Sequence, residues 1–346
     1  MSGVARPARV GFRCDAGVKS GVGHLVRCVA LAEELCARGA EVFFLGEVCG
    51  SAWARAQLRE RGLPLVPAPR EPARLAALAC ELRLDAVVLD SYDLPAGTGA
   101  ALRDARFAVL ALVDGDPLGQ EADLYLDQNL GAERRPFPLP AERLAGARYA
   151  LLRDSVRRRS RAVPGGNAVP RVLCFFGGTD SGGVAPAWAR ALSATGRPFL
   201  GTVVSPEPFE AAGPITVIPP TDRLPELMAA ADLVVTAAGS AVWELLYLGV
   251  PTALTWVADN QLIGYEELVG RGRRPGSGAR RTRRRPACWP ACSPTPPPAR
   301  NTAGGAAAWW TAGAASGSLT RCSGSARSDP SSTACRRRHP GRSAAP

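Results

Sequence analysis

Lysine, histidine and methionine are scarce in this sequence: its 346 residues contain one lysine, Lys19, two histidines and two methionines. The 42 basic side chains are therefore almost all arginine, which indicates GC-rich coding. Long apolar runs are missing too. No segment approaches the ~20 apolar residues of a bilayer-spanning helix, so we expect no stable insertion into a membrane. The N-terminal residues M-S-G-V-A-R-P-A-R-V lack the apolar stretch of a secretory signal, and we expect a cytoplasmic protein.

Charge is distributed very unevenly along the chain. Hydrophobic residues make up 46% of the sequence, which excludes a wholly disordered or collagen-like protein. The net charge of +11 would suggest a polyanionic partner such as nucleic acid. However, residues 271–346 hold fifteen arginines and one acid, Asp329, whereas the first 270 residues hold 27 basic and 30 acidic side chains. The body of the protein therefore has a net charge of −3, and we expect no nucleic-acid partner.

The arginine-rich segment 271–346 has three possible interpretations. It lacks Ile, Val, Phe, Tyr and Met and has one leucine, Leu319, so it cannot bury enough apolar surface to offset chain entropy, and we expect disorder. It could be a basic arm that binds nucleic acid, a natural low-complexity extension, or the product of a shifted reading frame. We favour the shifted frame, because a helical pattern, L-I-G-Y-E-E-L-V-G-R-G, stops abruptly where the segment begins. GC-rich DNA read out of frame also encodes mostly Arg, Pro, Gly, Ala and Ser.

The cysteines divide in the same way. Six of the ten lie in the body, mostly within apolar patterns, and we expect small buried side chains in a reducing compartment. These six are Cys14, Cys28, Cys36, Cys49, Cys80 and Cys174. The four cysteines of the arginine-rich segment and His339 show no zinc-finger spacing. We expect neither a metal site nor a cofactor.

Strand-like and helix-like patterns alternate through the body. Near-continuous apolar runs are typical of buried parallel strands, and apolar residues at a period of 3.6 indicate helices that cover them. We therefore expect an α/β protein with two doubly wound parallel-sheet (Rossmann-like) domains that face a cleft. The predicted domains are residues 1–156 and 171–270, joined by a polar linker at 157–170. The second domain ends too early and is predicted to be truncated. Expected strands lie at 8–14, 41–45, 85–90, 107–113, 124–127, 171–176, 199–204, 215–218, 232–236 and 252–256.

The first motif that carries chemistry is R-C-D-A-G-V-K-S-G-V-G-H-L-V-R-C at residues 13–28. Its glycines, Gly21 and Gly23 among them, let the backbone turn tightly after a strand and approach a ligand closely. The helix that follows would direct its free amides at a phosphate or carboxylate. His24, the body's one histidine, stands at the loop–helix junction and can take a proton from water near neutral pH. Asp15 is a candidate ligand contact, and Arg27 could hold a pyrophosphate or fix a neighbouring acid; a structural histidine and a surface arginine are the alternatives.

The second motif is T-A-A-G-S-A-V-W-E-L-L-Y-L-G-V-P at residues 236–251. A strand ends, Gly239 and Ser240 form a turn, and a helix begins at Ala241 with exposed backbone amides. Such a helix end binds phosphates through its donors and its dipole. Glu244 is then placed to accept hydrogen bonds from two ribose hydroxyls. Its alternative role is simply to stabilise the start of the helix.

Three further segments place polar groups at strand ends. F-G-G-T-D at residues 176–180 and W-V-A-D-N-Q at 256–261 would contact a nucleotide and a sugar, while L-D-S-Y-D at 89–93 lies beside the glycine loop. Asp114 and Asp116 end the strand of L-V-D-G-D-P. An ordinary turn is the alternative for each of these segments. The candidate ligand-binding residues in the first three are Gly177, Gly178, Asn260, Gln261, Asp90 and Tyr92.

Taken together and in order, these segments resemble the PseG/SpsG family. The resemblance covers residues 8–270 and is carried by G-V-G-H-L-V-R-C, L-D-S-Y, L-V-D-G-D, D-Q-N-L, Y-A-L-L-R, F-F-G-G-T-D, L-M-A-A-A-D-L, A-A-G-S-A-V-W-E-L and V-A-D-N-Q. That family includes the UDP-2,4-diacetamido-2,4,6-trideoxy-β-L-altropyranose hydrolases of pseudaminic acid synthesis and spore-coat polysaccharide proteins. It is more distantly similar to the MurG-type N-acetylglucosaminyltransferases.

The resemblance implies a GT-B fold and an enzyme that hydrolyses a UDP-activated amino sugar. His24 would be the catalytic base on a water that attacks the anomeric carbon, expelling UDP with inversion. Tyr92 and Asn260 match catalytic positions near the sugar, and Glu244 matches the ribose-binding acid. No metal is implied. The reaction would belong to nonulosonic-acid (pseudaminic acid-like) or surface polysaccharide biosynthesis.

Two departures from the family keep other functions open. Y-A-L-L-R-D replaces the more usual Y-A-L-L-R-P, and after Gly270 the match ends completely. A glycosyltransferase that uses a UDP-sugar donor is the first alternative, and an inactive, truncated pseudo-enzyme is the second. The sequence indicates neither the exact sugar nor the oligomeric state.

Overall fold

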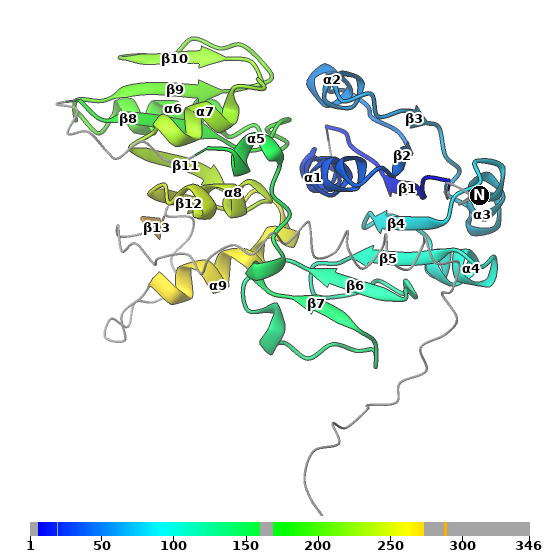
Figure 1. The fold of residues 1–346 in the computed structure, drawn as a ribbon. Helices are drawn as coiled ribbons and strands as arrows, with labels where there is room; N and C mark the ends of the chain where they lie inside the picture. The colour runs from blue at the N-terminus through cyan, green and yellow to red at the C-terminus, as the bar shows by residue number, and fades with distance from the viewer. Residues whose placement is uncertain (1–5, 19, 160–168, 273–286, 289–346) are drawn as a thin grey trace, which may run out of the picture.

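The computed structural model describes residues 6–18, 20–159, 169–272 and 287–288. Two α/β units lie side by side, each built on one sheet (Figure 1). The strands of the two sheets point toward each other, so that their carboxyl ends meet between the units (Figure 1). This arrangement confirms the predicted fold class of two parallel-sheet α/β domains that face a cleft.

The first sheet has the strand order β3-β2-β1-β4-β5-β6-β7, with every neighbouring pair parallel. Its strands are β1 (Arg9–Cys14), β2 (Glu41–Leu45), β3 (Leu65–Val66), β4 (Ala86–Asp90), β5 (Ala108–Leu112), β6 (Leu124–Asp127) and β7 (Arg143–Ala145). The helices of this unit are α1 (Gly23–Ala37), α2 (Ala52–Glu60), α3 (Pro72–Glu81) and α4 (Thr98–Asp104), with the 3-10 turns η1 (Ala132–Arg134) and η2 (Ala147–Tyr149).

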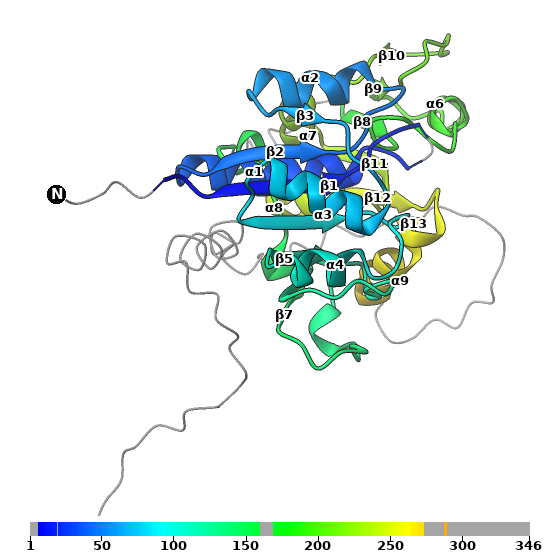
Figure 2. The ribbon, with the colours of Figure 1, turned by 90° about the vertical axis from the view of Figure 1, so that its right-hand side faces the viewer.

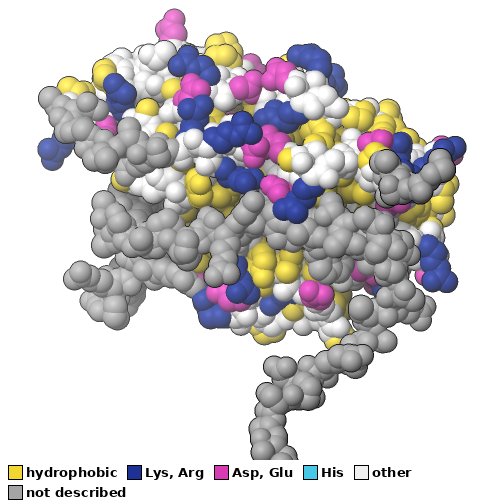
Figure 3. All heavy atoms as spheres, in the orientation of Figure 1, with side chains coloured by type: hydrophobic (Ala, Val, Ile, Leu, Met, Phe, Trp, Pro, Cys, Tyr) yellow, Lys and Arg dark blue, Asp and Glu magenta, His cyan; other side chains and the backbone are white. Residues whose placement is uncertain are grey.

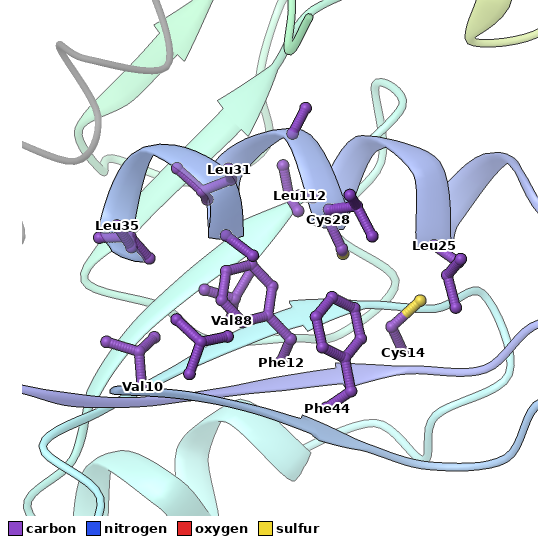
Figure 4. Close-up of a cluster of buried hydrophobic side chains, with 14 of the residues drawn as sticks. Val10, Phe12, Cys14, Leu25, Cys28, Leu31, Leu35, Phe44, Val88 and Leu112 are labelled. Atoms are coloured by element: carbon purple, nitrogen blue, oxygen red, sulfur yellow. The ribbon is translucent and has the colours of Figure 1, made fainter. Parts of the chain in front are cut away.

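Helices cover both faces of the first sheet, which is why its strands are continuously apolar. Successive residues of β4 enter opposite cores: Val88 packs beneath α1, and Val87 packs beneath α3 and α4. Figure 2 shows α3 and α4 on the side of the first unit that faces the viewer. Figure 4 shows the α1 side, where Leu25, Cys28, Leu31 and Leu35 recur at helical spacing against β1 and β2.

The second sheet has the order β10-β9-β8-β11-β12-β13. Its strands are β8 (Arg171–Phe175), β9 (Leu200–Val204), β10 (Ile215–Ile218), β11 (Leu233–Ala237), β12 (Thr252–Thr255) and β13 (Ala287–Cys288). All neighbours are parallel except β12 and β13, which pair antiparallel. The helices are α5 (Asp154–Arg157), α6 (Ala185–Ser193), α7 (Leu224–Ala230), α8 (Ala241–Leu248) and α9 (Leu262–Gly272), with the 3-10 turn η3 (Asp259–Gln261).

The segment that connects the two sheets packs against the second one before the predicted linker begins. Ala150 and Leu152 join a buried cluster with residues of α8, β12 and α9. Val156 is buried with residues of β8, α7 and α8. The domain boundary at residue 156 and the linker at 157–170 stay predictions.

The structure differs from the sequence-based predictions in two elements and in three cysteines. The sequence did not predict α4 or β7, because α4 follows one glycine, Gly97, and contains another, Gly99, while the three residues of β7 are too few to show a period. The expectation that all six body cysteines are buried is wrong for Cys36, Cys49 and Cys80, which are exposed. Of the arginine-rich segment, the structure describes only residues 271–272 and 287–288. Its three interpretations, and the predicted early end of the second domain, therefore concern residues outside the described part of the chain.

Figure 3 shows basic and acidic side chains interspersed over the described surface of one face. Within the described ranges, no helix combines the length and the apolar character that crossing a bilayer requires.

Candidate active site

A cavity of about 1010 Å³ lies where the carboxyl ends of the two sheets meet. Residues that follow β1, β4 and β5 form one wall, and residues that follow β8, β11 and β12 form the other. All candidate residues predicted from the sequence line this cavity except Asp90. Those that line it are Asp15, Gly21, Gly23, His24, Arg27, Tyr92, Gly177, Gly178, Gly239, Ser240, Ala241, Glu244, Asn260 and Gln261.

Two helices begin at this cavity and face each other across it. A Cβ atom on Gly23, the first residue of α1, would lie 3.3 Å from the Ser240 hydroxyl, which directly precedes α8. Gly21 has a φ of +72°, a left-handed conformation that lets the loop turn back before α1 begins. The positive ends of two helix dipoles therefore converge on one space, where they favour an anionic group.

His24 is held by a buried carboxylate. Its Nδ1 lies 2.5 Å from Oδ1 of Asp90, which is 0% exposed at the end of β4. Burial alone would raise the pKa of Asp90, but the Arg27 guanidinium and His24 outweigh burial and hold that pKa well below its ordinary value. Because the carboxylate is ionised, the shared proton belongs to Nδ1, and Nε2 is the nitrogen with a free electron pair.

Asp90 is fully buried and does not line the cavity, contrary to the sequence-based expectation. It lies behind His24 and contacts three protein groups: His24, Arg27 and Cys28. The Cys28 thiol, one turn beyond His24, donates to Oδ2 at 3.3 Å, and burial raises the pKa of this thiol. Asp90 is thus placed to orient the histidine and to stabilise its charged form.

Arg27 bridges two carboxylates. Its Nε and Nη2 donate to the two oxygens of Asp90 at 2.7 and 2.6 Å, and its Nη1 donates to both oxygens of Asp114 at 3.1 Å. Burial would lower the pKa of Arg27, but Asp114 and Asp90 outweigh burial and raise it. All three guanidinium nitrogens are engaged within the protein, which agrees with the predicted role of fixing a neighbouring acid, while the contact of Arg27 with a pyrophosphate stays a prediction.

Tyr92 stands next to His24, with the two ring centroids 4.6 Å apart in an edge-to-face arrangement. Its hydroxyl donates a hydrogen bond to Oδ2 of Asp114, and Asn260, which lines the cavity from the second unit, lowers the pKa of the same hydroxyl. Asn129, which follows β6, donates to Asp114 Oδ1 at 2.7 Å. Asp114 is therefore the centre of a network that the sequence showed only as an acid at a strand end.

Glu244 and Arg153 form a buried ion pair on the second wall. Arg153 donates from Nε and Nη2 to the two carboxylate oxygens of Glu244, at 2.7 Å each. Burial would lower the pKa of Arg153, but Glu244 outweighs burial and raises it. The structure thus places Glu244 at the cavity with a strong protein partner, and its predicted contact with a ribose stays a prediction. Nothing in the sequence pattern pointed to Arg153 apart from its place in Y-A-L-L-R.

Asp15 and Gln261 are held by local contacts at the cavity wall. Asp15 forms an ion pair with Arg13 at 2.8 Å and accepts a hydrogen bond from the backbone amide of Glu47 at 2.9 Å. Gln261 accepts from the backbone amide of Val257 at 2.9 Å. These bonds account for the positions of both side chains without a ligand.

Hydrogen bonds from α2 also span the cleft. Trp53 Nε1 donates to Oδ1 of Asp222 at 3.0 Å, and the Gln57 amide donates to the same oxygen. A Cβ atom on Gly178 would lie 2.7 Å from Val22 and 3.5 Å from Trp53, so the F-G-G-T-D loop meets the first unit closely. The sequence analysis missed this contact, because its partners are more than 160 residues apart and show no local pattern.

Comparisons with known proteins agree with the fold. No family model matches this chain. An uncharacterized protein of Methanocaldococcus jannaschii is 21% identical over 284 residues; the match covers 75% of this chain but only 58% of that protein.

Solved structures similar to this chain include three glycosyltransferase-fold proteins. MurG of Acinetobacter baumannii is 18% identical with a TM-score of 0.50, over 77% of this chain and 84% of that one. The glycosyltransferase SnogD of Streptomyces nogalater is 17% identical with a TM-score of 0.51, over 77% and 85%. UGT89C1 of Arabidopsis thaliana, in complex with UDP, is 13% identical with a TM-score of 0.55, over 77% and 84%. The chain has the two-domain GT-B fold that these structures share.

Proposed function

We propose that this chain is a cytoplasmic sugar-nucleotide hydrolase that binds a UDP-activated amino sugar between its two sheets and cleaves it at the anomeric carbon. The observation that carries this proposal is the His24–Asp90 pair, with Nε2 left as the basic nitrogen at a cavity where α1 and α8 both begin. A base and an anion-binding helix end in one cavity are the two groups that such a cleavage needs. The motifs shared with the PseG/SpsG family support the choice of substrate and of nonulosonic-acid or surface polysaccharide synthesis as its pathway.

In this mechanism His24 Nε2 takes a proton from a water molecule while the water oxygen forms a bond to the anomeric carbon. The bond from that carbon to the diphosphate oxygen breaks, and its electron pair leaves with UDP. Asp90 stabilises the imidazolium, because its ionised carboxylate lies 2.5 Å from Nδ1. The backbone amides at Ser240 and Ala241 stabilise the charge that develops on the departing diphosphate.

The remaining wall residues would position the two ends of the substrate. Glu244, oriented by Arg153, would accept hydrogen bonds from ribose hydroxyls. Tyr92 and Asn260 would contact the sugar beside His24.

A glycosyltransferase is the second candidate, and the extent of the cavity favours it. The lining continues past Tyr92 to Ala68, Arg70 and Asp93, beyond the ends of β3 and β4. That extension offers room for an acceptor whose hydroxyl would take the place of water. The fold is also that of solved glycosyltransferases.

Release of UDP from a panel of UDP-activated amino sugars, measured with and without added acceptor sugars, tests the proposal. We expect release without acceptor, and a loss of about 10²- to 10⁴-fold in the rate for His24→Ala. His339→Ala, which changes the chain's other histidine, is the matched control and should keep the rate.

Release that requires an acceptor would instead establish a transferase. A folded chain that binds no UDP would contradict both enzymatic functions, and a chain that does not fold would support the truncated pseudo-enzyme.

A further inference from the structure

The hydroxyl group of Tyr92 has a defined direction in this structure. The residue is 38% exposed and lines the cavity. That hydroxyl nevertheless meets a carboxylate, Asp114, which can only accept a hydrogen bond while it is ionised.

Asp114 is kept ionised by its surroundings. Arg27 donates to both of its oxygens at 3.1 Å, and the Asn129 amide donates to Oδ1 at 2.7 Å. Burial raises the pKa of Asp114, but Arg27 and the hydrogen bonds outweigh burial and lower it. The single Tyr92 proton must therefore lie on the line to Asp114.

The remaining side of the Tyr92 oxygen is an acceptor position for the same reason. Because the Tyr92 proton is directed at Asp114, a polar group that approaches the phenol oxygen from the second unit, where Asn260 lines the cavity, can only donate to it.

We propose that Asp114 is a positioning residue that holds the proton of the Tyr92 hydroxyl toward its own carboxylate, so that Tyr92 recognises a hydrogen-bond donor on the sugar. That donor is a hydroxyl or an N–H group. Tyr92 then does not protonate the leaving group. The identity of the ligand rests on the proposed function, whereas the direction of the Tyr92 proton does not.

The charges around Tyr92 determine how its ionisation should respond. Burial and the Asp114 carboxylate raise the pKa of Tyr92 above its ordinary value, against the opposing effects of Arg27 and Asn260. His24 is the other titratable group in contact with the ring. Replacing Asp114 by asparagine removes the negative charge but keeps the size of the side chain.

The first test is an NMR titration that needs no substrate. The full chain is labelled with ¹³Cζ-tyrosine, and Tyr92→Phe assigns one of its five tyrosine signals to Tyr92. An ordinary tyrosine ionises near pH 10, and we expect Tyr92 to ionise at a higher pH. Asp114→Asn should lower the titration midpoint of Tyr92 by about one pH unit. Asp116→Asn is the control: this acid follows in the same turn, accepts from the Leu118 amide at 2.8 Å, and should leave the Tyr92 signal unchanged.

The second test uses whichever UDP-sugar of the panel is cleaved. Tyr92→Phe and Asp114→Asn should each lower kcat/KM about tenfold or more, and the double variant should be no slower than the slower single one. Independent, additive losses would overturn the proposal. So would a Tyr92 signal that titrates as an ordinary tyrosine in the unmodified chain, or one that Asp114→Asn does not move. If no UDP-sugar is cleaved, the proposed function fails, and the titration alone still decides the role of Asp114.

Discussion

Arg153 and Glu244 join the segment that leaves the first sheet to the first turn of α8, through two parallel hydrogen bonds of 2.7 Å. Both side chains are buried, at 4% and 2% exposure. The charges are therefore shielded from solvent, and either one alone would be costly to bury. The pair fixes Glu244 at the cavity wall and ties the connecting segment to the second unit.

Removing one member of this pair should destabilise the protein strongly. Arg153→Met leaves the Glu244 charge buried without a partner, and we expect a loss of about 3–5 kcal/mol in the free energy of unfolding, measured with urea. The double variant with Glu244→Leu should recover most of that loss, because no unpaired charge remains. A double variant as unstable as the sum of the two single ones would contradict this account.

Asp90→Asn should slow the reaction without preventing UDP from binding. An asparagine amide can donate to Nδ1, which would move the imidazole proton to Nε2 and remove the basic electron pair. We expect the UDP-release rate to fall about 10²- to 10⁴-fold, and ¹⁵N spectra of His24 to show the changed tautomer. Asp85→Asn is the matched control, since Asp85 pairs with Arg6 at the opposite end of β4. Equal rates in both variants would reject the role given to Asp90.

The same carboxylates should make stability depend on pH in the acid range. The pKa values of Asp90 and Asp114 are lower in the folded protein than in the unfolded chain, where aspartate titrates near 4. On acidification through about pH 4 the unfolded chain therefore binds protons that the folded chain does not, and the free energy of unfolding falls. Above that pH their contribution is fully present. In urea unfolding at a series of pH values, the free energy of unfolding of Asp90→Asn should fall less steeply with decreasing pH than that of the unmodified chain. An unchanged slope would contradict this role of Asp90.

Asp222 should stabilise the closed cleft, because Trp53 and Gln57 of α2 both donate to it from the other unit. Asp222→Ala removes two hydrogen bonds that exist only when the units are together. We expect the Kd for UDP to rise roughly threefold to tenfold, as measured by calorimetry, with little change in unfolding of either unit. Glu226→Ala is the control: this acid, on α7, pairs with Arg159 and Arg223 within the second unit. Equal Kd values for the two variants would argue against the contact across the cleft.

Much of the fold could be predicted from local pattern alone. The apolar run of β4 and the helical spacing of Leu25, Cys28 and Leu35 each reflect burial against immediate neighbours. The starts of α1 and α8 followed from glycine loops that directly precede them. By contrast, β7 has three residues, and α4 follows Gly97 and has Gly99 in its first turn, so neither shows a clear period.

The roles within the site were harder to predict, because the partners are distant in sequence. Arg27 contacts Asp90 across 63 residues and Asp114 across 87. The sequence indicated a strand-end acid in each case, but it did not distinguish a group that faces substrate from one that lies behind His24. The sequence therefore predicts a substrate contact for Asp90, and for Asp114 only an acid at a strand end with an ordinary turn as the alternative.

The sequence by itself determined the alternating elements, the two glycine-led helix starts and the presence of a single body histidine at one of them, since all three depend on residues close together in the chain. Only the tertiary structure decided which charges meet. β1, β4 and β5 are neighbours in the sheet, so their carboxyl ends bring α1, Asp90 and Asp114 to one edge. There a single guanidinium, Arg27, can satisfy two carboxylates, one oriented toward His24 and the other toward Tyr92.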